Sequence, residues 1–320
     1  MTYQRAALSD DLNTLPKLPG WVTSGRAETF EAVAFRFGAA LTVLDQLVAD
    51  TSQGVPVKLL ANRLALTAAT ATSKLEGRLA RETDIRDAYH LAPPGEARGP
   101  DGDVLAFWRD AVGLKLTGHD WHDPVQDLVG AAFADDVLRL MAAGATRAKS
   151  HGPLAGCIAV MHVVLEMDDR AERIACMLSD IVLARALNWT SILPVTAHQL
   201  TKAMLRELTN EGQAADLRIR TSLLISIEDT IRLARDLATR AAALRAVTPK
   251  LRAKGSKAAV GLFLSEDAIG PSMMLSPTIK GTTIPMTDRA ARRFCDRLVE
   301  LGVARELTGR PTFRLYGIAP

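Results

Sequence analysis

The spacing of apolar residues constrains this chain more than any other feature of its sequence. From residue 28 to residue 50, Phe30, Val33, Phe37, Leu41 and Leu44 recur at steps of three and four. That spacing places side chains on one face of an α-helix, and it returns in most segments up to about residue 247. Aromatic residues make up only 5 % of the chain, which disfavours an all-β sandwich. We therefore predict a mainly α-helical fold.

Proline and glycine divide the periodic segments. The stretch 91–102 concentrates both residue types and is expected to be a loop, as is 117–124. Pro56 suits the first turn of a helix. The expected helices are 28–50, 56–75, 103–116, 124–149, 153–165, 169–187, 199–208 and 217–247.

The pattern changes near Thr248, where glycine and proline become frequent and the expected elements become short. A chain of 320 residues predicts about two domains. We expect an N-terminal extension at 1–26, an all-helical domain at 27–247 and a small C-terminal domain at 248–320.

Several classes of protein are disfavoured by composition. Hydrophobic residues make up 48 % of the chain, enough for a sizeable core. The N-terminus lacks the apolar stretch of a signal peptide, and no run approaches the ~20 residues of a membrane helix. The three cysteines are widely spaced, which argues against a disulfide framework or a zinc site and fits a reducing compartment. We expect a cytoplasmic protein with no membrane partner and no metal.

The net charge of +3 is unevenly distributed. From residue 250 onward there are 12 Lys and Arg against 6 Asp and Glu, whereas residues 1–249 hold 27 against 30. A basic segment on a mildly acidic body suggests a polyanionic partner. The alternative is a basic surface that is simply solvated.

The C-terminal segment has the order of elements typical of a winged helix-turn-helix. A short helix is expected at 257–267, and Thr287 offers an N-cap hydroxyl to a helix at 288–301. Two strands, 303–307 and 313–318, flank a Thr-Gly-Arg-Pro turn. On the second helix, an inward stripe is expected from Ala291, Phe294, Leu298 and Leu301.

An α-helix fits the major groove of DNA, and arginines bind guanine edges or phosphates. We therefore expect double-stranded DNA as the partner. Winged helices also dock proteins, in which case the arginines only solvate a helix face. The expected DNA-binding residues are Arg289, Arg292, Arg293 and Arg297 on the helix, with Arg310 and Arg314 on the hairpin.

Two short stretches of the body become informative together: TSKLEG at 72–77 and HVVLEMDDRAERIA at 162–175. With them, the chain from about residue 27 resembles the Fic family, whose motif is HPFx[D/E]GNGRxxR and whose inhibitory helix has [S/T]xxxE[G/N]. The resemblance implies an all-helical fold and, in active members, transfer of AMP from ATP to a protein hydroxyl. The matching residues are Thr72, Glu76 and Gly77 of the inhibitory pattern, and His162, Glu166, Arg170 and Arg173 of the core motif.

The chain departs from the family where phosphate would bind. The family's Gly-Asn-Gly anion hole is Met167, Asp168 and Asp169 here. Glycines let backbone amides approach phosphate, whereas a carboxylate ~4 Å from a phosphate charge costs roughly 4 kcal/mol at an effective dielectric of ~20. Alternatively, Asp169 and Glu172 form a helix-capping pair. The expected degenerate nucleotide site comprises His162, Glu166, Asp168, Asp169, Arg170 and Arg173.

The roles of His162 and of the pair Glu76 and Arg173 are further expectations. His162 is either a general base, as the resemblance implies, or a hydrogen-bonded core histidine among apolar neighbours. The resemblance also implies that Glu76 pairs with Arg173. Without a phosphate to block, that ion pair would tie two helices together.

The leading hypothesis is a DNA-binding regulator or mobile-element accessory protein, built on a degenerate Fic-like scaffold that needs no cofactor and forms homo-oligomers. The first alternative is an active Fic-type AMP or phosphoryl transferase that uses His162 with ATP and Mg²⁺. The second is a protein–protein interaction module of a toxin–antitoxin-like pair.

Overall fold

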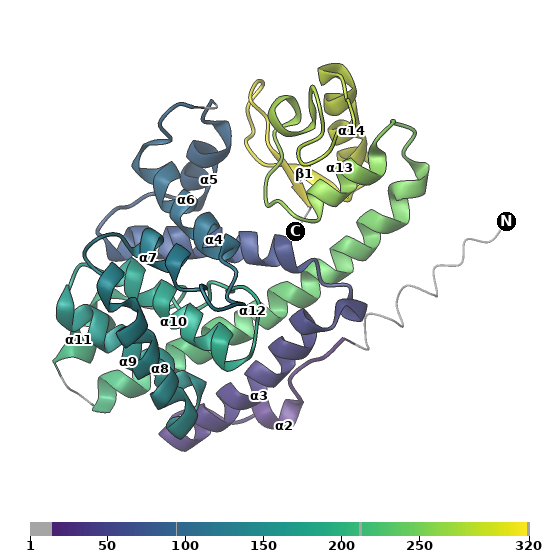
Figure 1. Ribbon diagram of the computed structural model, residues 1–320. Coiled ribbons are helices and arrows are strands. Elements are labelled where there is room, and N and C mark those ends of the chain that lie inside the picture. The colour runs from purple at the N-terminus through teal and green to yellow at the C-terminus, as the bar shows by residue number, and fades with distance from the viewer. Residues whose placement is uncertain (1–14, 94, 211–212, 319–320) are drawn as a thin grey trace. The chain divides into compact units, whose positions relative to one another are not determined.

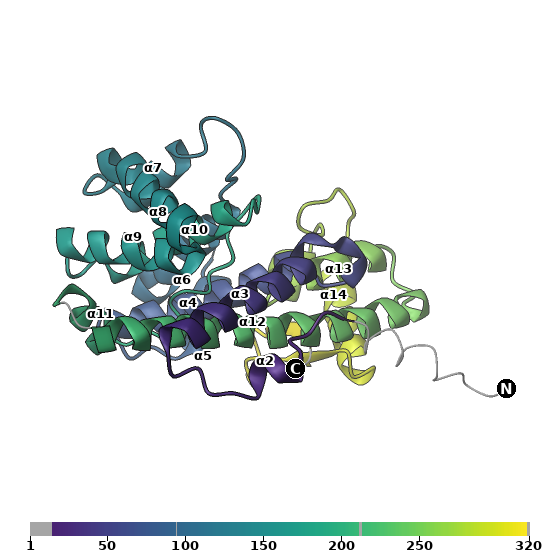
Figure 2. The ribbon, with the colours of Figure 1, turned by 90° about the horizontal axis from the view of Figure 1, so that it is seen from below.

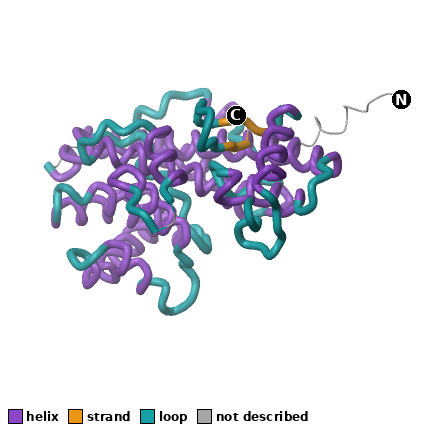
Figure 3. The backbone as a smooth tube through the Cα atoms, turned by 90° about the horizontal axis from the view of Figure 1, so that it is seen from above, coloured by secondary structure: helices purple, strands orange, loops and turns teal. Residues whose placement is uncertain are grey.

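A computed structural model describes residues 15–93, 95–210 and 213–318, and these residues are mainly helical (Figure 1). The described strands are two three-residue segments, β1 (Ala304–Glu306) and β2 (Tyr316–Ile318), which are orange in Figure 3. The expectation of a mainly α-helical fold is confirmed.

The helices follow one another with short connections. Their bounds in chain order are α2 (Gly20–Thr23), α3 (Phe30–Ala49), η1 (Thr51–Gln53), α4 (Val57–Leu75), α5 (Glu82–Leu91), α6 (Gly99–Gly113), α7 (Asp123–Val129), η2 (Ala134–Asp136), α8 (Val137–His151), α9 (Pro153–Met167), α10 (Glu172–Ala186), α11 (Lys202–Thr209), α12 (Gln213–Val247), η3 (Thr248–Lys250), α13 (Ser256–Phe263), η4 (Pro271–Leu275) and α14 (Asp288–Glu300).

Several elements differ from the sequence-based expectation. Helix α5 lies where no helix was expected, and α6 begins inside the expected loop at 91–102. The expected single helix at 124–149 is interrupted, because Gly130 adopts a φ of 76° and ends α7. Both strands are shorter than expected. Residues 1–14 of the expected N-terminal extension lie outside the described residues.

The chain divides into two compact units that do not follow chain order. One unit comprises 42–62 and 231–318 with 15–18, and the other comprises 19–41 and 63–230. Helices α3, α4 and α12 therefore contribute residues to both units. The division falls inside α12, between residues 230 and 231, whereas the boundary expected at residue 248 lies at the end of that helix.

In the unit formed by 19–41 and 63–230, α8, α9 and α10 lie side by side in both views (Figures 1 and 2). Two glycines allow this approach. A Cβ atom on Gly144 would lie 2.4 Å from Val160 Cγ2 and 2.7 Å from Val182 Cγ2. A Cβ atom on Gly156 would lie 2.7 Å from the carbonyl oxygen of Gly144. A larger residue at either position would force its neighbours to move, so these glycines keep α8 in close contact with α9 and α10.

A buried carboxyl ties α10 to the segment that follows it. Asp180 is 1 % exposed, and its Oδ1 accepts hydrogen bonds from the backbone N–H groups of Val195 and Thr196 at 3.0 Å each. Its Oδ2 has no partner. Burial raises the pKa of Asp180 to about 8, because an apolar environment disfavours the charged form. Nearby, Thr196 donates to the carbonyl oxygen of Cys176 at 2.9 Å.

The cysteines of the chain are free thiols buried in the two units. Cys157 and Cys176 lie in the unit that contains α9 and α10, and Cys295 lies on α14. Burial raises the pKa of all three thiols. They pack as small apolar side chains.

In the other unit, the segment 256–318 forms a small helix-and-strand arrangement. Helix α13 is followed by a bridge between Ile269 and Tyr316, then by η4 and α14. Strands β1 and β2 are antiparallel, with Ala304 opposite Ile318. Ile269 and β1 therefore both pair with the strand that contains Tyr316. The buried residues beneath α14 include Phe263, Ala291, Phe294, Leu298 and Leu315.

Helix α3 passes a test for membrane-spanning length and composition, with a mean hydropathy of 1.4 over 18 residues. Core helices of other proteins pass the same test. Here Val33 and Phe37 are buried, and Arg36 donates from Nε and Nη2 to Glu228 of α12 at 2.5 and 2.8 Å. These contacts bury one side of α3, and 33 % of the apolar window is buried in the fold.

We predict that Asp180→Asn changes how stability depends on pH. A carboxyl with a pKa of about 8 in the fold and about 3.9 in the unfolded chain binds its proton more tightly when folded. The wild type therefore loses stability as pH rises from about 4 to about 8. Asparagine keeps the acceptor oxygen and does not titrate. At pH 9 the free energy of unfolding of the variant should therefore exceed that of the wild type by at least about 1 kcal/mol.

Urea unfolding at pH 5, 7 and 9 measures this difference. Asp180→Ala is the control. It leaves the N–H groups of Val195 and Thr196 without their acceptor and should lower the free energy of unfolding by about 1–3 kcal/mol at every pH. A difference between Asp180→Asn and wild type that does not vary with pH would contradict a protonated Asp180.

Candidate functional site

A hollow of about 700 Å³ lies beside α14 and is lined by basic side chains. We call it the basic hollow. Among the residues that line it, all of them described, there is no carboxylate. Its cations are Lys250, Arg252, Arg289, Arg293 and Arg297.

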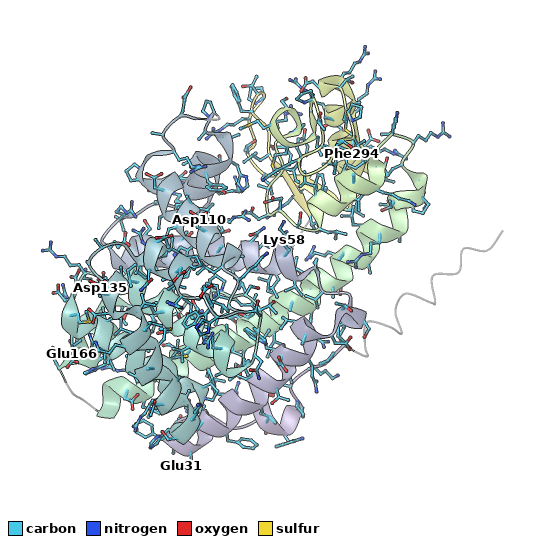
Figure 4. The ribbon with its side chains drawn as sticks, in the orientation of Figure 1. Glu31, Lys58, Asp110, Asp135, Glu166 and Phe294 are labelled. Atoms are coloured by element: carbon cyan, nitrogen blue, oxygen red, sulfur yellow. The ribbon has the colours of Figure 1, made fainter. Side chains whose placement is uncertain are left out.

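The position of these arginines follows from the local structure of α14. Thr287 caps the helix by accepting the N–H of Ala290 at 3.3 Å. Arg289, Arg293 and Arg297 recur every four residues, so they share one face. Phe294, labelled in Figure 4, lies on the buried stripe of the same helix. The apolar stripe packs inward, and the arginine row remains exposed beside the hollow.

The charges of the basic hollow are largely unbalanced. Among the described residues, Arg252, Arg289 and Arg293 have no ion-pair partner, and Arg297 pairs with Glu300 at 2.8 Å. By contrast, Arg292 does not line the hollow and pairs with Asp288 at 2.9 Å. The hollow therefore offers an anion several cations that no carboxylate neutralises.

The two hairpin arginines lie outside the basic hollow. Arg310 and Arg314 occupy the exposed loop between β1 and β2, where Arg314 Nε donates to the carbonyl oxygen of Arg310 at 3.1 Å. The structure thus brings together three of the six expected DNA-binding residues and places the other three at separate positions.

Sequence reasoning missed Lys250 and Arg252. They follow α12, more than thirty residues before α14, and no local motif connects the two segments. One signal was present, because Lys250, Arg252, Lys254 and Lys257 form a short basic run without an acidic residue.

The residues of the expected degenerate nucleotide site lie on α9, on α10 and in the connection between them. On α9, His162 Nδ1 lies 3.2 Å from Glu166 Oε2, one helical turn apart. Their side chains are 29 % and 55 % exposed, and Figure 4 labels Glu166 at the end of α9. His162 is therefore half-buried and pairs with a carboxylate, and this geometry is compatible with both interpretations of the residue.

The connection between the two helices is exposed and carries the two aspartates. Asp168 Oδ1 accepts the N–H of Arg170 at 2.9 Å, while Asp169 is exposed. The N-cap of α10 is Ala171, without a side-chain hydrogen bond. Glu172 is 2 % exposed and lies 3.0 Å from Lys202 Nζ. The capping pair expected from Asp169 and Glu172 is thus wrong, because Glu172 turns inward to a cation.

The structure brings Glu76 and Arg173 together. Arg173 donates from Nε and Nη2 to the two carboxylate oxygens of Glu76, at 2.7 Å each. Arg78 adds a third hydrogen bond at 2.8 Å, and the Arg173 guanidinium lies 5.2 Å from the ring centre of Phe107. Arg170 is exposed and outside this cluster. The cluster joins the end of α4 to the first turn of α10.

The other residues of the inhibitory pattern have structural roles. Thr72 donates to the carbonyl oxygen of Ala68 at 2.8 Å and accepts from Trp108 Nε1 at 3.0 Å. Gly77 has a φ of 84° and follows the end of α4. Within the described residues, no three His, Cys, Asp or Glu side chains are placed to hold a metal ion.

Comparison with known protein families places these sites in context. Residues 6–318 match the model of the family described as "Protein of unknown function (DUF1403)". No curated protein matches the sequence. The match covers both the basic hollow and the α9–α10 junction.

We predict that Arg173→Ala lowers stability more than Arg292→Ala does. The first change breaks a two-bond pair whose side chains are 26 % and 20 % exposed, and it should cost about 1–3 kcal/mol. The second breaks a solvent-exposed pair one helical turn apart and should cost under about 1 kcal/mol. Chemical denaturation of both variants measures the difference, and equal losses would show that the Glu76 pair contributes no more than a surface pair.

Proposed function

This chain belongs to the DUF1403 family, and we propose that it binds double-stranded DNA through the basic hollow and the arginines near it. The observation that carries the proposal is the row of Arg289, Arg293 and Arg297 that shares one hollow with Lys250 and Arg252. Among these cations, Arg252, Arg289 and Arg293 have no ion-pair partner within the described residues. Such cations attract a polyanion strongly, because phosphate contacts release condensed counterions.

We propose that the segment 256–318 is a winged helix-turn-helix. The order of α13, η4, α14, β1 and β2 supports this, as does the pairing of both Ile269 and β1 with the strand of Tyr316. In this proposal α14 enters the major groove, where Arg289, Arg292, Arg293 and Arg297 contact bases or phosphates. Arg310 and Arg314 of the hairpin loop contact the backbone.

The proposed role is that of a cytoplasmic regulator or mobile-element accessory protein. The helical body would serve as a homo-oligomerisation scaffold. In a symmetric dimer, two copies of α14 would contact half-sites about one helical turn of DNA apart. The interaction itself needs no cofactor.

We predict that Arg293→Ala weakens duplex binding and lowers the slope of log affinity against log salt by about one unit. Arg252→Ala should do the same, although it lies far from α14 in sequence. Arg292→Ala should have a smaller effect, because Asp288 already balances its charge. Fluorescence anisotropy with a labelled duplex between 50 and 200 mM salt measures both quantities, a range over which phosphate contacts dominate the change.

The matched control is Arg139→Ala, an exposed arginine of α8 that pairs with Asp136. It should leave affinity and salt slope unchanged. Duplex binding that is absent, or that does not depend on salt, would overturn the proposal.

A second candidate is a Fic-like body with nucleotide-dependent transferase activity. The observation that favours it is the Glu76–Arg173 pair, since the resemblance implies that an inhibitory glutamate binds the second motif arginine. His162, paired with Glu166, would be the base. Asp168 and Asp169 stand where the family binds phosphate, and their charge opposes ATP. We therefore rank this function below DNA binding.

Calorimetric titration with ATP and Mg²⁺ separates the two candidates. A degenerate site predicts no measurable heat for the wild type or for Glu76→Gly, which frees Arg173. If Glu76→Gly binds ATP and transfers AMP to a protein hydroxyl while His162→Ala does not, the second candidate is correct.

A further inference from the structure

The loop between β1 and β2 presents an aromatic side chain to solvent. Phe313 is 74 % exposed, whereas Leu315, two residues later, and Tyr316, the first residue of β2, are buried. An exposed phenyl ring does not gain the hydrophobic stabilisation that burial normally gives such a side chain. The fold therefore gains nothing evident from an aromatic residue here.

The backbone of Phe313 is also unusual. Its φ is 55°, in the left-handed region that bulky residues rarely adopt. The other described non-glycine residue with a positive φ is Asn188, whose type tolerates that conformation. Such backbone strain persists where neighbouring structure imposes it, and it concentrates at functional positions.

Hydrogen bonds on both sides of the loop hold Phe313 in place. The Glu306 carboxylate accepts from the N–H groups of Thr308 and Gly309 at 2.8 and 2.7 Å. On the other side, Arg314 Nε donates to the carbonyl oxygen of Arg310. The loop therefore displays the ring to solvent, in a segment that also carries the exposed Arg310 and Arg314, instead of folding it against the core.

We propose that Phe313 is a wedge that inserts between stacked base pairs of bound duplex DNA from the minor groove. This inference rests on the proposed function. A base step is a flat apolar slot with phosphates on both sides, which complements an exposed phenyl ring in a loop that also carries two exposed arginines. Apolar side chains inserted in this way unstack the step and bend the duplex. Pyrimidine–purine steps are the easiest to open, so a TA step is the preferred position.

The test uses the full chain and duplexes that carry 2-aminopurine at a central TA step or a central GC-flanked step. Binding of the wild type should raise 2-aminopurine fluorescence, more so at the TA step, and energy transfer between end labels should report a bend. Phe313→Gly should bind about tenfold more weakly, the scale of one lost stacking contact, and abolish both signals. Glycine adopts a positive φ freely, so this variant should fold at least as stably.

Two further variants complete the test. Phe313→Leu retains an apolar wedge and should retain most of both signals. Phe35→Ala removes an exposed aromatic residue of α3 and should change neither. Wild-type fluorescence and bending that persist in Phe313→Gly would overturn the inference and leave DNA binding intact. A wild type that binds no duplex would overturn the proposed function itself. Binding to single strands alone, lost in Phe313→Gly, would overturn the wedge and show that the ring stacks on unpaired bases.

Discussion

The close approach of α8 and α9 is the constraint around which one of the two units is arranged. Gly144 and Gly156 leave no room for a Cβ atom, and valines from α9 and α10 fill the space that their missing side chains create. Because the helices cannot move apart or together without a void or a clash, their packing is tightly constrained. Glu172 and Arg173 then lie where Lys202 and Glu76 can meet them.

The two candidate sites differ in how their charges are balanced. At the α9–α10 junction each buried or half-buried charge has a partner: Arg173 and Arg78 with Glu76, and Glu172 with Lys202. Such a cluster stabilises the local structure and leaves little charge for a ligand. In the basic hollow, cations from two distant segments converge, and within the described residues Arg252, Arg289 and Arg293 have no ion-pair partner. That difference favours the hollow as the place where an external anion binds.

The long amphipathic helices could be predicted from the sequence because burial imposes a period close to 3.6 residues. α3 and α4 agree with prediction to within about two residues at each end. Helix α5 could not be predicted, because its sequence, ETDIRDAYHL, carries too few apolar residues to show a helical period. Part of the segment 91–102 is a turn, as expected, but its glycine and proline at 99 and 100 form the first turn of α6.

For the basic hollow, the arginines of α14 could be predicted because they share one helix, whereas Lys250 and Arg252 depend on tertiary packing. The burial of a side chain also depends on residues that are near in space but distant in sequence. Apolar residues surround His162 in sequence, yet the side chain is only half-buried and lies beside the exposed Glu166. Glu172 is charged, yet it is almost fully buried.

The distribution of cysteines gives the molecule a set of native reporters. Cys157 and Cys176 lie in one compact unit and Cys295 in the other, and all three thiols are shielded. Since only an accessible thiolate reacts quickly with an alkylating reagent, modification at each position requires the surrounding helices to separate first. Mass-resolved alkylation therefore records the opening of each unit independently, without any engineered label.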